Sequence, residues 1–587
     1  MERLKHNDNE RHPSLRAWVS LVVIAAMVTA SMAAPPDVTG GEEPPQEAVA
    51  ARPGSTPARF ARIQPQIPSA NRSERNKVFI ENADEMVFDE ARSADYQVLR
   101  GNVRFSRAGM FMYCDSAYFH PESSSLDAFG HVRMTRGGGE EGTCEVLHYY
   151  ADREVAEMRR NVVLRNRNMT LTTDSLDYDM AANMGYYYNG GKIVDSKGNV
   201  LESEECSYNT RTDDATFDNF VTLNNPKFEL STRSLLYNTR THIATIIDET
   251  DIYSKGRDRN HIRTNSGYYN TSADNGTLYN RSLIETSDDR DMVGDTLFYD
   301  RREGYGEARG NIIINDYKNK TILDGDYGYH NERTHYSFVT KRARARITQT
   351  IKNEYGNLEE ETLHVHADTL RTFLDEDSIR VVTAQHDVRY YRSDVQGLCD
   401  SAAMSQRDSI MNMYRHAVVW NENHQVVGDE INVHFNDSTA DWAMLPAGGM
   451  LAEELGEHYY NQLSGKKMMA FFEDKELRRL EVDGNVRVIF YPEEQDSTIN
   501  KQVAAESSHL NIDLKEKQEV DKIKMWPNVS GTVTPLFLLK PSGLYLSGFK
   551  WYGDLRPQSP DDIFDTSIDP STIDAPVVGR HRSTSAK

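Results

Sequence analysis

The sequence is poor in cysteine, in basic residues and in long apolar runs, and each scarcity excludes a class of protein. Only four cysteines occur in 587 residues, so the chain is not a disulfide-stabilised scaffold. Because 90 Asp and Glu outnumber 67 Lys and Arg, the net charge of −23 argues against non-specific nucleic-acid binding. Hydrophobic residues make up 38%, and a mean hydropathy of −0.66 excludes a polytopic membrane protein.

Proline is scarce in the middle of the chain and common at both ends. Residues 69–445 contain only two prolines, and because proline removes a ladder donor, this scarcity indicates a continuous hydrogen-bonded body. Eight of the 20 prolines lie between residues 35 and 68, which predicts a disordered Pro-rich leader over residues 34–76. A similar composition predicts a disordered tail over residues 553–587.

The first 33 residues have the pattern of a secretory signal peptide. Arg11 and Arg16 precede an apolar run of 14 residues, and small residues precede a cleavage site after Ala33. Because that run is short for a spanning helix, we expect cleavage and export. An uncleaved N-terminal segment that keeps the protein membrane-associated is the alternative.

A short phrase recurs along the body of the chain. Each copy has an anchor, usually polar, followed by apolar residues two and four positions later, the second often aromatic. Nine regular anchors are 29 to 32 residues apart and five looser ones follow, which makes about fourteen units. The anchors are Asp84, Asp115, Glu145, Asp174, Glu204, Arg233, Asn265, Asp295 and Gly325, then Asp368, Asp400, Asp429, Lys466 and Glu506.

A second phrase follows some anchors by about 15 residues, as in Gly101-Asn102-Val103 and Gly310-Asn311-Ile312. Gly and Asn tolerate the positive φ of a tight turn, and the β-branched residue then opens a strand. The alternation within the first phrase places its apolar residues on one strand face. Each unit is therefore predicted to be turn, strand, turn, strand, and stacked units share one core. The predicted fold is an elongated all-β stack, regular over residues 77–340 and more divergent over residues 341–552.

The alternation of these two phrases behind a signal peptide resembles the OstA-like domains of lipopolysaccharide-transport proteins, the OstA/LptA family. The Asp-Ser-Leu-x-Tyr phrase at residues 174–178 and the Gly-Asn-Val phrase at residues 101–103 carry the resemblance, which covers roughly residues 77–535. It implies a V-shaped antiparallel β-jellyroll whose groove holds the acyl chains of lipid A in the periplasm of a Gram-negative bacterium. It also implies end-to-end contact with other Lpt-type jellyroll proteins in a bridge to the outer membrane, or assembly into a homo-oligomer.

The resemblance therefore predicts a lipopolysaccharide-binding and transport protein that is not an enzyme and needs no cofactor or metal. A structural or adhesive surface β-solenoid without lipid transport is the alternative, and a carbohydrate-active β-helix enzyme is a third interpretation. Inward positions of the repeats are the groove candidates, although a closed dry core would use the same positions. They are Phe105, Leu147, Leu176, Tyr178, Leu235, Tyr237, Leu297, Tyr299 and Ile312.

Two further residue patterns are relevant to metal binding and to disulfide formation. His364, His366 and Asp368 place three potential metal ligands on one strand face, but Asp368 is a repeat anchor, which favours a solvated strand face. Cys114 and Cys144 each precede an anchor in successive repeats. If stacked strands bring their Cα atoms within about 4.4–6.8 Å, a disulfide forms after export; buried free thiols are the alternative.

Overall fold

The computed structural model describes residues 77–573 except for gaps at residues 89–94, 138, 256–258, 287–288, 332, 353–357, 437–438, 457, 474–475, 495–497, 516–519 and 566–571. The predicted signal peptide and leader lie outside the described residues. Within them, the regular elements are β-strands and short 3-10 turns, and no helix is long and apolar enough to cross a membrane. The predicted all-β fold class is confirmed.

The chain divides into two compact units, with the boundary between residues 287 and 288. We call them the N-terminal unit and the C-terminal unit. The strands of the N-terminal unit are β1 (Phe79–Asn82), β2 (Glu85–Val87), β3 (Gln97–Arg107), β4 (Met110–His120), β5 (Ser125–Arg136), β6 (Glu140–Tyr150), β7 (Val155–Arg165), β8 (Met169–Asp179), β9 (Met184–Tyr187), β10 (Gly191–Asp195), β11 (Val200–Ser203), β12 (Glu205–Asn209), β13 (Asp214–Asn224), β14 (Phe228–Asn238), β15 (Ile243–Ile246), β16 (Thr250–Ser254), β17 (His261–Thr264), β18 (Gly267–Asn270) and β19 (Asn275–Thr286).

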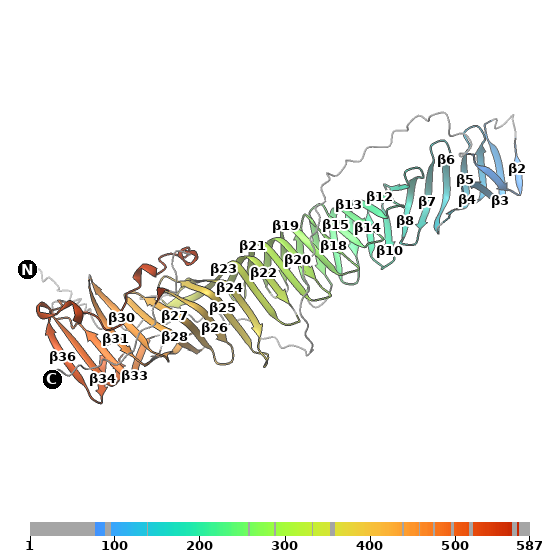
Figure 1. Ribbon diagram of the computed structural model, residues 1–587. Coiled ribbons are helices and arrows are strands. Elements are labelled where there is room, and N and C mark those ends of the chain that lie inside the picture. Colours follow the sequence, from blue (N-terminus) through green and yellow to red (C-terminus); the bar gives the residue numbers. More distant parts are fainter. Residues whose placement is uncertain are drawn as a thin grey trace, which may run out of the picture. The chain divides into compact units, whose positions relative to one another are not determined.

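Neighbouring strands of the N-terminal unit pair antiparallel in chain order (Figure 1). In places two short strands replace one long strand. β9 and β10 both pair with β8, and β11 and β12 both pair with β13. The ladder is therefore continuous along this unit, although the strands differ in length.

The long strands bend in the middle at a bulge, where the Gly-Asn phrase lies. In β3, Gly101 and Asn102 have φ of 71° and 47°, and the register against β4 shifts between Arg100 and Val103. Two residues of β3 therefore oppose the single anchor Asp115. The predicted tight turn between two strands is wrong here: the phrase is a corner within one strand, since a bulge and a turn both require positive φ.

The anchor carboxylates hold these corners. The Asn102 amide donates to Asp84 Oδ2 at 2.8 Å, and His131 Nδ1 lies 2.7 Å from Asp115 Oδ2. A Cβ on Gly130 would lie 2.4 Å from Asp115 Oδ2, so a side chain at this position would displace the anchor carboxylate. The anchor of the first phrase and the Gly-Asn pair of the second phrase therefore contact each other at the same bulge.

The corners divide the ladder of the N-terminal unit into two arms. The first arm contains residues 97–100 of β3 and 116–120 of β4, and the second arm contains residues 103–107 and 110–114 of the same strands. Buried side chains of the two arms face one another, and the rings of Phe105 and Phe119 lie 6.1 Å apart between centroids. The core of this unit therefore lies between its arms.

The C-terminal unit continues the same antiparallel pattern with mostly longer strands (Figure 1). Its elements are β20 (Arg290–Asp300), β21 (Tyr305–Asp316), β22 (Thr321–Asn331), β23 (Tyr336–Lys352), β24 (Leu358–Leu374), β25 (Arg380–Tyr391), β26 (Val395–Ser405), β27 (Ile410–Asn421), β28 (His424–Asn436), β29 (Thr439–Leu445), β30 (Gly449–Gly456), β31 (Tyr459–Gly465), β32 (Lys467–Glu473), β33 (Glu476–Phe490), β34 (Lys501–Leu514), β35 (Val520–Trp526), β36 (Ser530–Pro535), and the 3-10 turns η2 (Leu536–Leu538), η3 (Pro541–Gly543), η4 (Gly553–Leu555) and η5 (Asp562–Phe564).

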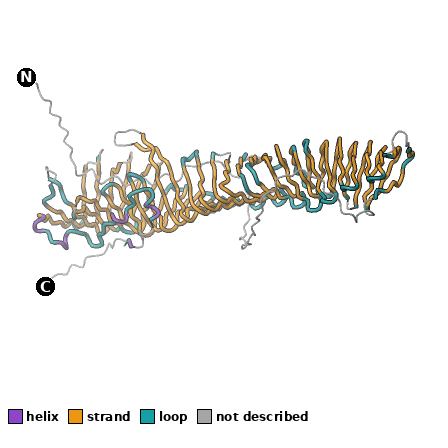
Figure 2. The backbone as a smooth tube through the Cα atoms, turned by 90° about the horizontal axis from the view of Figure 1, so that it is seen from above, coloured by secondary structure: helices purple, strands orange, loops and turns teal. Residues whose placement is uncertain are grey.

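The described part of residues 536–573, which we call the C-terminal strap, crosses the outer face of β24–β34, and its 3-10 turns are purple in Figure 2. Tyr552 and Ile573 form a buried cluster with Leu398 and Trp420, on the side of the sheet opposite its inner core. Ile563 is fully buried as well. Over residues 553–565, 572 and 573 the structure therefore differs from the disordered tail expected over residues 553–587, because long-range contacts order residues whose composition favours disorder.

Four buried glutamines on alternate strands of the ladder bind the strap, three of them through its backbone. The Gln425 amide donates to Lys550 O at 2.9 Å and accepts from Tyr552 N at 2.7 Å, as a neighbouring strand would. Gln462 binds Leu544 O and Leu546 N in the same way. The remaining contacts are Gln502 with Gly543 O at 2.9 Å and Gln396 with Arg556 Nε at 2.7 Å.

Candidate functional site

The structure places all nine predicted groove residues on the strands of the two ladders. Eight are buried, and Tyr299 is half-buried. The N-terminal unit holds Phe105 on β3, Leu147 on β6, Leu176 and Tyr178 on β8, and Leu235 and Tyr237 on β14; the C-terminal unit holds Leu297 and Tyr299 on β20, and Ile312 on β21. A groove wall and a closed core both bury such residues, so burial alone does not distinguish a groove from a core. The space between the arms and the contacts that join the arms do distinguish them.

The two arms of the N-terminal unit meet at polar clusters that recur once per repeat. Each cluster, which we call a latch, combines a residue at the end of the second arm with a tyrosine 42 residues later and a polar residue 47 residues later. The tyrosine stands four positions after an anchor. The five latches are Arg107/Tyr149/Glu154, Arg136/Tyr178/Asn183, Asn166/Tyr208/Asp213, Asp195/Tyr237/His242 and Lys227/Tyr269/Asp274.

The first latch is a buried ion pair. Arg107 donates to the hydroxyl of Tyr149 and, at 3.2 Å, to Glu154 Oε1. Burial lowers the pKa of Arg107, and the nearby Glu154 carboxylate opposes that shift. The cation and the carboxylate come from different arms, so their pairing holds the arms together.

The fourth latch is centred on the buried carboxylate of Asp195. Tyr237 donates to it, Asn199 Nδ2 donates at 2.7 Å, and His242 Nδ1 lies 2.8 Å away. Burial alone would raise the pKa of Asp195, but these hydrogen bonds outweigh burial and hold the pKa below its ordinary value. Burial and the neighbouring Asp195 raise the pKa of Tyr237. The charged carboxylate is therefore the stable form.

The second latch is the weakest of the five. Arg136 is exposed, and its guanidinium reaches Asn183 Oδ1 at 3.4 Å. Each of the other four latches contains a carboxylate, whereas Asn183 carries no charge. This contact therefore adds little to the attraction between the arms.

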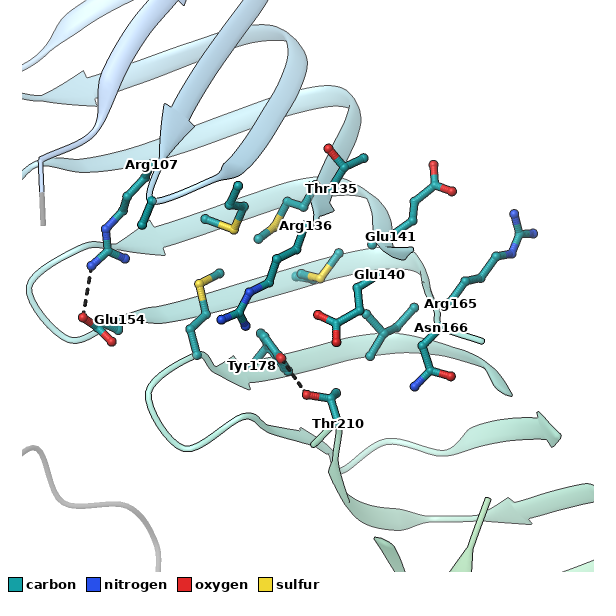
Figure 3. Close-up of a pocket in the computed structure, with 17 residues that line it drawn as sticks. Arg107, Thr135, Arg136, Glu140, Glu141, Glu154, Arg165, Asn166, Tyr178 and Thr210 are labelled. Carbon is teal, nitrogen blue, oxygen red and sulfur yellow. Dashed lines mark hydrogen bonds and ion pairs between the residues drawn. The ribbon is translucent and has the colours of Figure 1, made fainter. Parts of the chain in front are cut away.

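A pocket of about 240 Å³ opens at the second latch, between the first and the third (Figure 3). Its apolar lining is rich in methionine, an unbranched side chain that adapts to irregular surfaces. Its polar lining carries both signs of charge. The apolar residues are Met110, Met134, Met158, Leu164, Tyr178 and Met180, and the charged ones are Arg107, Arg136, Arg165, Glu140, Glu141 and Glu154.

Sequence reasoning named Tyr178 and Tyr237 only as groove candidates, and it missed the latches that these tyrosines form with polar residues of the other arm. A sequence signal for them exists in the fixed spacing, because a polar residue stands 47 positions after the second-arm residue in every latch. In the structure these polar residues all have positive φ, from 56° at Glu154 to 67° at Asp274. These residues end the hairpin turns of the first arm. The pairing across the arms, however, joins strands that are three positions apart along the ladder, which local patterns do not reveal.

The histidine pattern on β24 forms no metal site in the described part of the chain, where no group of three or more such side chains converges. His366 Nδ1 lies 2.7 Å from Ala343 O, and the ring packs 4.8 Å from that of Phe564 in the strap. Burial lowers the pKa of both His364 and His366. His366 therefore contributes to the docking of the strap.

The thiols of Cys114 and Cys144 are free and buried. Cys114 lies on β4 and Cys144 on β6, so β5 separates them by two strand spacings, about 9.6 Å. That separation is too long for the disulfide considered from the sequence. Burial raises the pKa of each thiol to about 12, which keeps both protonated.

The pocket lies in the part of the chain that matches a known protein family. Residues 75–233 match the family model described as OstA-like protein. No curated protein sequence matches the chain significantly. The matched range contains every residue that lines the pocket and the first three latches. The repeat phrases of the sequence predicted this similarity, and residues 75–233 are OstA-like.

Proposed function

We propose that this protein binds lipopolysaccharide in the periplasm of a Gram-negative bacterium and carries it within a bridge to the outer membrane. The observation that supports this proposal is the coincidence of the OstA-like match with a methionine-lined pocket between the arms. In the proposed pathway residues 1–33 direct export, and an uncleaved segment would keep the protein membrane-associated.

The chemistry of the pocket suits an anionic amphiphile. Its methionines and Leu164 accept acyl chains, and the exposed guanidinium groups of Arg136 and Arg165 suit the phosphates of lipid A. The predicted groove residues Leu147, Leu176 and Tyr178 would line the path along the interior. Carrying a lipid makes and breaks no covalent bond, so the proposal assigns no catalytic residue.

The sheet edges support end-to-end contact with other jellyroll proteins or with a second copy. Among the described strands, β1 and β2 pair only with β3, and β35 and β36 pair only with β34. Large apolar side chains are exposed at both edges, including Phe79 and Met86 at one and Ile523 and Val533 at the other. Unpaired edges of this kind recruit further strands.

Site-specific photocrosslinking tests the proposal. We would place benzoylphenylalanine at Met134, in the pocket, and irradiate the protein in cells that synthesise lipopolysaccharide. Phe220 is the matched control because it is 80% exposed at a corner, where a benzoyl group faces water. We expect a lipopolysaccharide adduct at position 134 and none at position 220. Absence of an adduct at position 134, together with lipid-free purified protein, would refute lipid carriage and favour the structural or adhesive solenoid.

A further inference from the structure

We propose that the second latch is the entry port through which acyl chains reach the interior of the N-terminal unit, while the four stronger latches keep the arms closed. This inference rests on the proposed function, because it concerns how the same pocket is loaded. It assigns to Arg136 and Asn183 control of the rate of loading.

The interior must open before it can hold a lipid. The pocket of about 240 Å³ is smaller than the roughly 300–1,000 Å³ of typical ligand sites. Around it, Leu147 and Leu176 are fully buried and Tyr178 is 9% exposed. Uptake therefore requires the arms to separate, and the latches are the polar contacts that join their free ends.

Separation costs least at the second latch. In the first, third, fourth and fifth latches a carboxylate with little exposure pairs with a donor, and a separated partner would be left unsatisfied until water reaches it. At the second latch Arg136 is already exposed, so it keeps its hydration when its contact with Asn183 breaks. The weak latch and the pocket coincide, which is the arrangement that a port requires.

The chain itself indicates how to close the port. Three latches carry an acidic residue at the position of Asn183, namely Glu154, Asp213 and Asp274, and all share its positive φ. Asp tolerates this conformation as Asn does. Asn183→Asp would therefore add a carboxylate opposite Arg136 without a change in backbone.

The test measures uptake of fluorescent lipopolysaccharide by the full-length protein in stopped flow. We expect Asn183→Asp to slow uptake about two- to fivefold, the range for one exposed ion pair, and high salt to restore the rate. In an Arg136→Gln background Asn183→Asp should not slow uptake any further than Arg136→Gln does alone, because no pair can form. Asn189→Asp is the matched control, since Asn189 is exposed outside the pocket and gains the same charge.

The outcomes separate this inference from the proposed function. If wild type and Asn189→Asp load while Asn183→Asp loads equally fast and folds normally by circular dichroism, the port is refuted and lipid carriage stands. If wild type itself takes up no lipopolysaccharide, the proposed function fails and the port fails with it. Slower loading caused by Asn183→Asp in the wild-type background, but not in the Arg136→Gln background, supports the port.

Discussion

Glu154→Gln is the most direct test of the latches as structural elements. The substitution removes the carboxylate that faces Arg107, whose side chain is 7% exposed, while that of Glu154 is 22% exposed. Loss of one partner from a buried pair costs about 3–5 kcal/mol. Because Glu154 is partly hydrated and Arg107 keeps its bond to Tyr149, we expect about 2–3 kcal/mol. For a unit of this size that corresponds to about 4–12 °C in its melting temperature.

Glu157→Gln is the matched control. Glu157 lies 3.2 Å from Arg159, the same separation as in the latch, but about a third of each side chain is exposed. We expect a loss of less than about 1 kcal/mol. Thermal denaturation by circular dichroism and hydrogen exchange of the peptides around residues 107 and 154 would measure both variants in the full chain.

A double variant shows whether the buried charge is the cause. Arg107→Met with Glu154→Gln removes both partners, so it should regain part of the stability lost in Glu154→Gln. Equal losses in Glu154→Gln and Glu157→Gln would refute the latch as a stabilising contact. Failure of the double variant to recover would mean that the unpaired Arg107 is not what destabilises the single variant.

Three further predictions concern the corners, the fourth latch and the strap. Gly130→Ala should destabilise the N-terminal unit by at least about 1–2 kcal/mol in urea denaturation, because φ is 76° and the new Cβ would meet Asp115. The pKa of Asp195 is lower in the folded state than in the unfolded state, so the charged carboxylate stabilises the fold above pH about 4. This stabilisation is lost as the pH falls further, and hydrogen exchange around residue 195 should therefore rise on acidification. Gln425→Ala leaves Lys550 O and Tyr552 N without their partner and should raise proteolysis of the strap several-fold.

Each of these predictions has a control in the same chain. Gly137→Ala should be tolerated, since nothing lies within 4 Å of its Cβ and its φ is not positive. Asp195→Asn should remove the acid dependence at the fourth latch. Gln406→Ala, at an exposed glutamine, should leave the strap protected. A loss at Gly137 equal to that at Gly130, an acid response that survives in Asp195→Asn, or strap cleavage equal in both glutamine variants would contradict the respective explanations.

The comparison of sequence and structure separates local from non-local information. The alternation after each anchor, such as Leu176 and Tyr178 after Asp174, correctly indicated strands with one buried face. The Gly-Asn phrase correctly indicated positive φ. It did not show that these residues form a bulge within one strand and not a turn between two strands. A turn and a bulge need the same dihedral angles, and the difference is whether the residues after the bend continue along the same neighbouring strands.

Sequence alone determined the all-β class, the repeat of about 30 residues, the OstA-like character and the burial of the groove candidates, because period-two alternation and turn residues act within a few positions of the chain. Only the tertiary structure decided that the arms of the N-terminal unit are joined by latches, that one latch lacks a carboxylate, and that a strap rich in Pro, Asp and Ser is ordered by four distant glutamines. The physical reason is that these contacts join residues 41 to 160 positions apart, where bending and stacking of the strands, not local propensity, determine which polar groups meet.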